Sequence, residues 1–457
     1  MSNRVRFPEL DLLRFLAAVA VMLFHYTFRG PADHWWSASF PLLRQIFKYG
    51  FLGVNVFFLL SGFVILLTAY EKDAIAFTIA RIVRLYPAYW ISVTLTALVL
   101  VLVRDPRHHI SLGLYLTNLT MIQNYLNVPD VSGVYWSLAV ELKFYFLIFL
   151  ILLARQIHNL SKFLGAWLVA SVLLSLKKPH GIANFFLFPE WSSYFIAGAM
   201  FFLIHRQGIS AYKILVIISC YALSVAYALG ILPLGDKGTA ALDVSGPVLV
   251  TLLGLSYLLF FVIAIRQGRP GSSTAFYVVG LITYPLYLLH QDLGYVLLRW
   301  ASPLLNRYVL LCAVMAAMIA LAWLVNRGLE RRLASVLNKF LTSISGNVAV
   351  VISRQAANKT TASADADPVL PRNESAPVPS ILQIASLEAA SRTASPEPAA
   401  SQIVPVPCVE PLAVAPSPDL VQAASNRIAP SMPTPDNVLG IIADSRQAED
   451  NLPKPST

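Results

Sequence analysis

The residues best suited to chemistry lie in the first long apolar segment, residues 9–26. This segment carries Asp11, Arg14 and His25 among leucines, alanines, valines and phenylalanines. At about 100° per residue, the step from Arg14 to His25 returns to within about 20° of the same helix face. Ionisable side chains are costly inside a membrane, so they normally face a bundle interior or a water-filled cavity. The spacing predicts a polar site on one face; the alternative is that Arg14 and His25 snorkel to the two membrane surfaces.

Five further ionisable residues stand in later apolar runs. Arg81 and Arg84 are three residues apart, so they share a helix face, and the planar guanidinium group suits phosphate oxygens. The alternative role for this pair is to anchor a span at the cytoplasmic surface. Glu141 and Lys143 point to different sides of one helix, so each requires a partner of its own. His290 follows a helix-kinking proline and is either a lining residue or a core histidine with satisfied hydrogen bonds.

The composition is that of a membrane protein. Hydrophobic residues make up 57% of the 457 residues and charged residues only 13%, far from the balance of a soluble domain. The formal net charge of +10 belongs to the membrane-embedded part, where loop cations report topology and lipid headgroups rather than nucleic acid. The three cysteines form neither a disulfide framework nor a metal-binding spacing, so we expect no metal.

The hydropathy pattern predicts an all-α polytopic protein with about ten transmembrane helices within residues 1–328. Runs long enough to cross about 30 Å of hydrocarbon lie near residues 11–28, 50–69, 87–103, 136–154, 161–177, 190–205, 212–231, 246–265, 276–299 and 308–326. Residues 111–126 are too short and too polar for a span, which favours a re-entrant or interfacial segment. Loop cations favour a cytoplasmic location for both termini, in the inner (plasma) membrane.

Two further segments follow the last span. Residues 329–340 place leucines and a phenylalanine at helical spacing among basic residues, which predicts an amphipathic helix along the inner leaflet. Residues 341–457 are rich in Ala, Ser and Pro and poor in aromatic residues, which predicts a disordered cytoplasmic tail.

Four motifs, in this order along the chain, resemble the acyltransferase 3 family of polytopic membrane acyltransferases. The resemblance covers roughly residues 7–330. The motifs are Arg14 followed after ten residues by His25, the Arg-x-x-Arg of Arg81 and Arg84, the Trp-Ser-Leu-x-x-Glu that ends at Glu141, and the Tyr-Pro-Leu-Tyr-Leu-Leu-His that ends at His290.

The resemblance implies an enzyme that transfers an acyl group, most simply acetyl, from acyl-CoA to a hydroxyl of a cell-surface or exported glycan or glycolipid. It associates the Arg-x-x-Arg pair, Arg81 and Arg84, with the donor; the predicted topology places Arg14 toward the cytoplasm with them, so we expect it to bind the donor as well. Imidazole titrates near neutral pH, so His25 is the candidate general base, and a covalent acyl-histidine intermediate is the alternative. Asp11 and His290 are expected to support the site.

Counting residues from the predicted membrane surfaces gives each polar group a depth. At 1.5 Å per residue, Glu141 and His25 come out at similar depths below the outer surface, so we expect Glu141 to bind and orient His25. Asp11 lies too far from His25 along the same helix and is expected to pair with Arg14. The sequence thus predicts catalytic roles for His25 and Glu141 above a cluster of arginines.

Two other functions remain open from the sequence. A transporter would use the intramembrane His, Glu and Arg side chains as an ion path, although the two halves show no evident repeat. A scaffold that recruits partners through its tail would explain the tail but not the buried charges. Neither the oligomeric state nor the acceptor follows from the residues.

Overall fold

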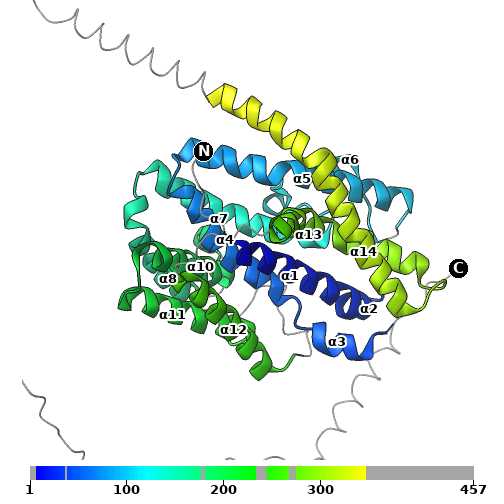
Figure 1. Cartoon of the computed structure of the whole chain (residues 1–457), viewed down its shortest axis with the longest axis horizontal. Coiled ribbons are helices and arrows are strands. Elements are labelled where there is room, and N and C mark those ends of the chain that lie inside the picture. The colour runs from blue at the N-terminus through cyan, green and yellow to red at the C-terminus, as the bar shows by residue number, and fades with distance from the viewer. Residues whose placement is uncertain are drawn as a thin grey trace, which may run out of the picture. The chain divides into compact units, whose positions relative to one another are not determined.

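A computed structural model describes residues 7–36, 39–105, 107–176, 181–232, 244–266 and 274–345. In these residues every regular element is a helix (Figure 1), as the hydropathy pattern predicts. The predicted disordered tail falls almost wholly outside them, because only residues 341–345 of that segment are described, and these are helical.

The helices follow one another through short connections. Their bounds are α1 Pro8–Phe24, the π-helical turn η1 His25–Arg29, α2 Gly30–Ala32, α3 Pro41–Phe47, α4 Leu52–Ala69, α5 Ala74–Leu102, α6 Leu112–Leu119, the 3-10 turns η2 Gln123–Leu126 and η3 Gly133–Tyr135, α7 Trp136–Leu153, η4 Ile157–Asn159, α8 Leu160–Ser175, α9 Ile182–Leu187, α10 Pro189–Gln207, α11 Ala211–Ala228, α12 Gly246–Ile265, α13 Thr274–Ala301, α14 Arg307–Val325 and the π-helical turn η6 Asn326–Glu330.

Nine helical segments within the described ranges are long and apolar enough to cross a membrane. α13 is also long, with 28 residues, but it carries His290 and other polar side chains along its length. It corresponds to the ninth predicted span and would measure about 42 Å. Residues 111–126 form only the short α6 and η2, which agrees with the prediction that they do not span.

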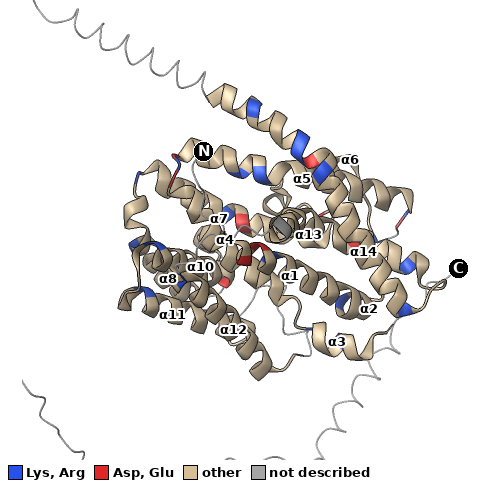
Figure 2. Ribbon diagram, in the orientation of Figure 1, with Lys and Arg blue, Asp and Glu red and all other residues tan. Residues whose placement is uncertain are grey.

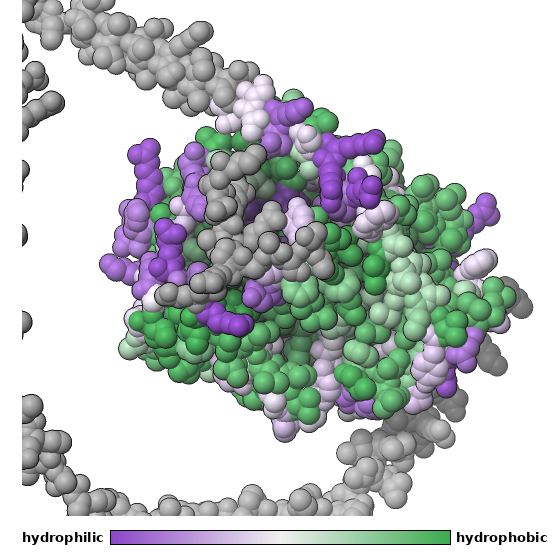
Figure 3. Space-filling view, in the orientation of Figure 1, coloured by the Kyte–Doolittle hydropathy of each residue, from purple (hydrophilic) through white to green (hydrophobic). Residues whose placement is uncertain are grey.

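Among the described residues, connections contact other parts of the chain near each end of α5. Near its start, the Tyr70 hydroxyl after α4 donates to the Ile157 carbonyl after α7, at 3.3 Å. Near its end, Arg299 near the end of α13 pairs with Asp105 after α5, at 3.2 Å. Hydrophilic side chains gather along the upper edge of the face drawn in Figure 3, near α5 and the helix that continues α14, whereas hydrophobic side chains cover its lower part.

The segment after α14 differs from the expected separate helix. Residues 331–345 continue α14 through η6 as one helical segment, Arg307–Ser345, and the helical part extends beyond residue 340. Arg331, Arg332 and Lys339 lie on that extension, which carries Lys and Arg, coloured blue, in Figure 2. Whether it lies along the inner leaflet stays a prediction.

Lys143 on α7 finds aromatic rings rather than a carboxylate. Its Nζ lies 4.4 Å from the centre of the Phe185 ring and 5.4 Å from that of Tyr125. A cation over an aromatic face is attracted by the ring quadrupole. The side chains of Glu141 and Lys143 therefore have separate partners, as their spacing requires.

α4 and α10 pack at very close range because each has a glycine at the crossing. A Cβ on Gly62 would collide with the Phe195 carbonyl, and one on Gly198 with the Leu59 carbonyl. Small residues allow this close backbone approach in membrane bundles. α10 is almost completely buried, so this contact fixes α4 within the bundle.

We expect Gly198→Ala to lower the stability of the folded bundle, because the new methyl group meets backbone that cannot yield by a rotamer change. Overpacking of this kind costs about 1–3 kcal/mol. The measurement is the melting temperature in detergent. Gly113→Ala on α6, whose added Cβ would meet nothing closer than 4.0 Å, is the matched control. Equal melting temperatures for the two variants would contradict this account of the crossing.

Candidate active site

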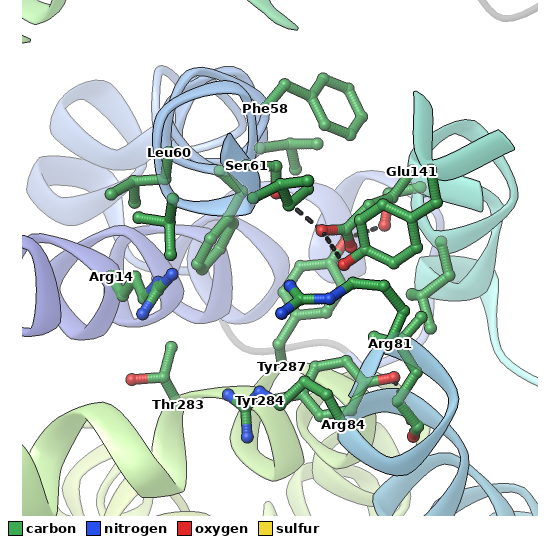
Figure 4. Close-up of a pocket in the computed structure, with 18 residues that line it drawn as sticks. Arg14, Phe58, Leu60, Ser61, Arg81, Arg84, Glu141, Thr283, Tyr284 and Tyr287 are labelled. Carbon is green, nitrogen blue, oxygen red and sulfur yellow. Dashed lines mark hydrogen bonds between the residues drawn. The ribbon is translucent and has the colours of Figure 1, made fainter. Parts of the chain in front are cut away.

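Three arginines converge on one internal cavity of about 120 Å³. Arg14 reaches it from α1, and Arg81 and Arg84 reach it from α5 (Figure 4). We call this space the arginine cavity; Ser61, Glu141, Tyr145, Thr283, Tyr284 and Tyr287 are among the other residues that line it. The sequence prediction that the three arginines form one cluster agrees with this geometry.

Each arginine has contacts that hold it in place. Arg14 pairs with Asp11 at 3.3 Å, the partner predicted from the sequence. Arg81 donates from Nη2 to the Thr68 hydroxyl at 3.1 Å, and its Nε is buried without a hydrogen-bond partner among the described residues. Arg84 pairs with Glu330 of η6, with 3.7 Å between nitrogen and oxygen. An arginine fork with unused donors is suited to binding an anion.

A second space, the vestibule, lies next to the arginine cavity and shares Arg14, Val64 and Arg84 with it. It has a volume of about 400 Å³, and its other lining residues come from the start of α1 and of α13 and from α4. Gly280 of α13 leaves room for the Asp11 carboxylate, because a Cβ there would come within 2.7 Å of it. The arginine cavity is therefore adjacent to the side of the bundle where α1 begins.

Glu141 lies in the arginine cavity, and the prediction that it binds His25 is wrong. Its Oε1 accepts hydrogen bonds from the Ser61 hydroxyl at 2.7 Å and from the Tyr145 hydroxyl at 2.8 Å. The carboxylate thus faces the level of Arg14, about 16 Å below His25 along α1 at 1.5 Å per residue.

The depth estimate failed because α7 begins inside the bundle rather than at its surface. Ser132 and Tyr135, just before α7, are 1% and 0% exposed. Ser132 donates a hydrogen bond to Asp292, and the Ser137 hydroxyl is hydrogen bonded to Tyr287. The chain has therefore already descended to the middle of α13 where α7 starts, which carries Glu141 deeper than a surface start would.

His25 pairs with His290, at 3.1 Å between Nδ1 of His25 and Nε2 of His290. Nδ1 of His290 lies 2.8 Å from the Tyr287 carbonyl, and a carbonyl only accepts, so Nδ1 carries the proton and Nε2 is the acceptor. Nδ1 of His25 lies 2.9 Å from the Val21 carbonyl and is a donor by the same reasoning. In the neutral pair, Nε2 of His25 therefore holds an unprotonated lone pair.

The backbone positions this pair. His25 is the first residue of η1, and π-helical turns occur often at functional sites because they shift the register of the side chains that follow. The Tyr26 hydroxyl donates to the His290 carbonyl at 2.7 Å, which ties η1 to α13 at this height. The sequence left two alternatives for His290, a lining residue or a core histidine with satisfied hydrogen bonds. In the structure His290 is fully buried and in contact with His25.

A further polar cluster lies beyond the histidines, toward the other side of the bundle. Asp292 is 2% exposed, accepts from Ser132, and lies 3.6 Å from His108. Asp105 and Arg299, which are close in sequence to His108 and Asp292, form an ion pair with each other. Polar groups thus occur at successive heights along α13.

A family model described as an acyltransferase domain matches residues 7–327. The chain belongs to the acyltransferase 3 family. The matched range contains all residues that line the arginine cavity and both histidines of the pair; Glu330, the partner of Arg84, lies just beyond it. The family domain is therefore the whole membrane bundle.

Several relatives share part of this domain. The chain is 29% identical over 199 residues to the peptidoglycan O-acetyltransferase OatA of Listeria monocytogenes, a match over 38% of this chain and 29% of that protein. It is 31% identical over 150 residues to the acyltransferase MdmB of Streptomyces mycarofaciens, over 31% and 38% of the two chains. It is 32% identical over 157 residues to the putative peptidoglycan O-acetyltransferase YrhL of Bacillus subtilis, over 30% and 22%. The matches thus span less than two fifths of these relatives, and no solved structure matches the chain.

Sequence reasoning assigned no role to Ser61, Tyr145, Tyr287 or Glu330 in this family site. Tyr145 follows Glu141 by four residues, so helical spacing alone was a usable signal for their hydrogen bond. Glu330 is an acidic residue in an otherwise basic segment, which also signals a specific partner. Tyr287 belongs to one of the four motifs and Ser61 lies in the predicted span 50–69, but nothing in the sequence distinguishes their side chains from packing residues.

We expect Glu141→Gln to leave the pH–rate profile of acyl transfer in place, because the carboxylate does not contact His25, whereas His290→Gln should move its midpoint. Glutamine keeps an acceptor oxygen for the Ser61 and Tyr145 hydroxyls, so Glu141→Gln tests charge rather than packing. The measurement is kcat/KM against pH in membranes that contain equal amounts of each variant. A shift with Glu141→Gln and none with His290→Gln would show instead that the Glu141 carboxylate interacts with His25.

Proposed function

We propose that this protein transfers an acyl group, most simply acetyl, from acyl-CoA to a hydroxyl group of a cell-surface or exported glycan or glycolipid. The observation that carries the proposal is the arrangement along α1 and α13: a cavity with three arginines at one height and a histidine pair at another. Because the chain belongs to an acyltransferase family, we assign the arginine cavity and the histidine pair to the same acyl-transfer reaction.

The arginine cavity supports an anionic donor. Arg14, Arg81 and Arg84 come from two helices and face one space, and the vestibule beside it has about 400 Å³. Hydrogen bonds between guanidinium and phosphate are charge-assisted and among the strongest in proteins. The phosphates of a coenzyme A thioester would bind at these arginines, with the thioester arm directed along α13 toward His290.

The histidine pair supports proton removal from a hydroxyl acceptor. Nε2 of His25 takes the proton of the acceptor hydroxyl as its oxygen attacks the thioester carbonyl carbon; the carbon–sulfur bond breaks, and the proton passes to the departing thiolate. His290 holds the tautomer in which Nε2 of His25 is free. In the alternative route the same Nε2 first attacks the thioester carbonyl carbon, the carbon–sulfur bond breaks and the thiolate leaves. The acceptor hydroxyl oxygen then attacks the acyl-histidine carbonyl carbon, and its proton passes to the departing imidazole.

The glycan acceptor is supported by the relatives and by the position of the histidines. Two of the relatives are described as peptidoglycan O-acetyltransferases, one of them putatively. The histidine pair lies farther along α1 and α13 from the vestibule than the arginine cavity does. With both termini in the cytoplasm, as the loop cations favour, the histidines lie nearer the outer face of the plasma membrane. Membership of an acyltransferase family favours this function over transport.

Mass spectrometry of envelope and exported glycans, with and without the gene, tests the proposal. The expected result is loss of one ester from one glycan, which also identifies the acceptor and the acyl group. Unchanged esters on every glycan class would contradict the proposal.

We expect His25→Ala to reduce acyl transfer by at least a hundredfold, because general-base catalysis typically contributes about 10²–10⁴, while the protein still inserts and accumulates. The measurement is the ester content of the glycan at matched expression. His158→Ala in η4, between α7 and α8, is the control and should retain activity. Activity of His25→Ala above a tenth of the parent level would remove His25 from the role of base.

We expect Arg81→Ala and Arg84→Ala to weaken acyl-CoA binding about tenfold or more, because each removes a charge-assisted contact worth about 1.5–3 kcal/mol. The measurement is the dissociation constant of acetyl-CoA for purified protein in detergent. Arg206→Ala is the matched control: Arg206 lies over the Tyr70 ring at 4.8 Å and lines neither the arginine cavity nor the vestibule. Unchanged affinity in both cavity variants would contradict donor binding and favour the alternative role of these arginines, which is to anchor a span at the cytoplasmic surface.

A further inference from the structure

One side chain, Tyr287, separates the arginine cavity from the histidine pair. Its ring lines the cavity, and its centre lies 5.8 Å from that of the His290 ring, one helical turn further along α13. His25 and His290 themselves do not line the cavity. A group that passes from the arginines to Nε2 of His25 along α13 therefore meets the Tyr287 ring first.

Contacts from three other elements hold this ring in place. Its hydroxyl is hydrogen bonded to the Ser137 hydroxyl of α7 at 2.8 Å and donates to the Val134 carbonyl of η3 at 3.3 Å. On the α4 side, its centre lies 5.4 Å from that of the Phe57 ring, edge to face. Tyr287 and Ser137 are 7% and 6% exposed. The ring is thus a closed wall in this structure.

The wall must move if a thioester arm is to reach the histidines from the arginine cavity. Neither His25 nor His290 lines the arginine cavity or the vestibule. Both spaces therefore end on the arginine side of the Tyr287 ring in this structure.

We propose that Tyr287, held by Ser137, is a gate that closes the path between the donor cavity and the histidine pair until a donor displaces it. The inference rests on the proposed acyl-CoA donor and adds a residue that controls its access. It also gives a role to the serine of the Trp-Ser-Leu-x-x-Glu motif. Tyr287 positions and admits the donor; it is not a proton donor or acceptor in the transfer.

A gate of this kind has a measurable signature. A donor that binds only the open form has its apparent affinity reduced by the fraction of protein that is open. Removal of the hydrogen bond that favours the closed form should therefore tighten donor binding, by about threefold to tenfold for one neutral hydrogen bond. A residue that merely stabilised the bundle would give unchanged or weaker binding.

The test measures the dissociation constant of acetyl-CoA for the full-length protein in detergent. The variants are Tyr287→Phe, Ser137→Ala and the double variant. Each removes the same Tyr287–Ser137 hydrogen bond, and Tyr287→Phe keeps the ring. Tyr221→Phe is the matched control, because it deletes a tyrosine hydroxyl that binds the Val250 carbonyl at 3.0 Å between α11 and α12, away from the cavity.

The expected result is tighter binding in both single variants, no further gain in the double variant, and no change in Tyr221→Phe. Binding by the parent protein with no gain in either single variant, or with gains that add in the double variant, would overturn the gate and leave the proposed function intact. No binding of acetyl-CoA by the parent protein would overturn the proposed donor, and the gate with it.

Discussion

A charge buried in this bundle must find a partner there, and the architecture of the site follows from that constraint. Moving an ion out of water costs several kcal/mol even after relaxation, unless other groups compensate. The ionisable groups at the arginine cavity and its edge are three cations and three anions: Arg14, Arg81, Arg84, Asp11, Glu141 and Glu330. They come from α1, α5, α7 and η6, so the charge balance itself links these four elements. Arg14 and Arg84 are paired with carboxylates and Arg81 is bonded to the Thr68 hydroxyl, so each of the three cations has a partner in the bundle.

The same constraint explains why the polar groups are arranged at separate heights. Arg14 and Arg84 pair with carboxylates, and His25 pairs with His290. The Tyr287 ring, which is hydrogen bonded to Ser137, closes the space between these two groups. α13 carries one residue for each level on neighbouring turns, with Tyr284 at the cavity, Tyr287 at the wall and His290 at the pair. Because these side chains share one rigid helix, their spacing is fixed by helical geometry at about 4.5 Å per three residues. The arginine cavity, the Tyr287 ring and the histidine pair are therefore held at fixed spacings along α13.

Local spacing predicted the fold and much of the site, and the part that failed depends on long-range packing. Asp11 with Arg14, and Arg81 with Arg84, are neighbours on single helices, so their placement follows from 3.6 residues per turn. The depth of Glu141 depends instead on where α7 begins. Residues 111–126, which were predicted to be re-entrant or interfacial, include Asn118 and Gln123, and both side chains are fully buried. They bind the loop that leads into α7: Asn118 binds the backbone at Pro129 and Val131, and Gln123 binds the Asp130 side chain. Hydropathy cannot distinguish a buried polar loop from an exposed one.

The pairing of His25 with His290 could not be predicted from local spacing either. These two residues are 265 positions apart in the sequence, and no pattern within either helix specifies their contact.

Helices α8, α10, α11 and α12, which carry none of the four motifs, have a structural role. The residues that line the arginine cavity come from α1, α4, α5, α7 and α13, whereas α8, α10, α11 and α12 contribute none to it. α10 is buried between α4 and the other members of this group, and buried hydroxyls join them: Ser192 donates to Ser171 of α8, and Ser224 of α11 is hydrogen bonded to Ser193 and Tyr257. Interhelical hydrogen bonds and glycine contacts stabilise membrane bundles where apolar burial adds little. These helices therefore form a rigid support for α4, and α4 in turn holds Ser61 against Glu141 and Phe57 against Tyr287.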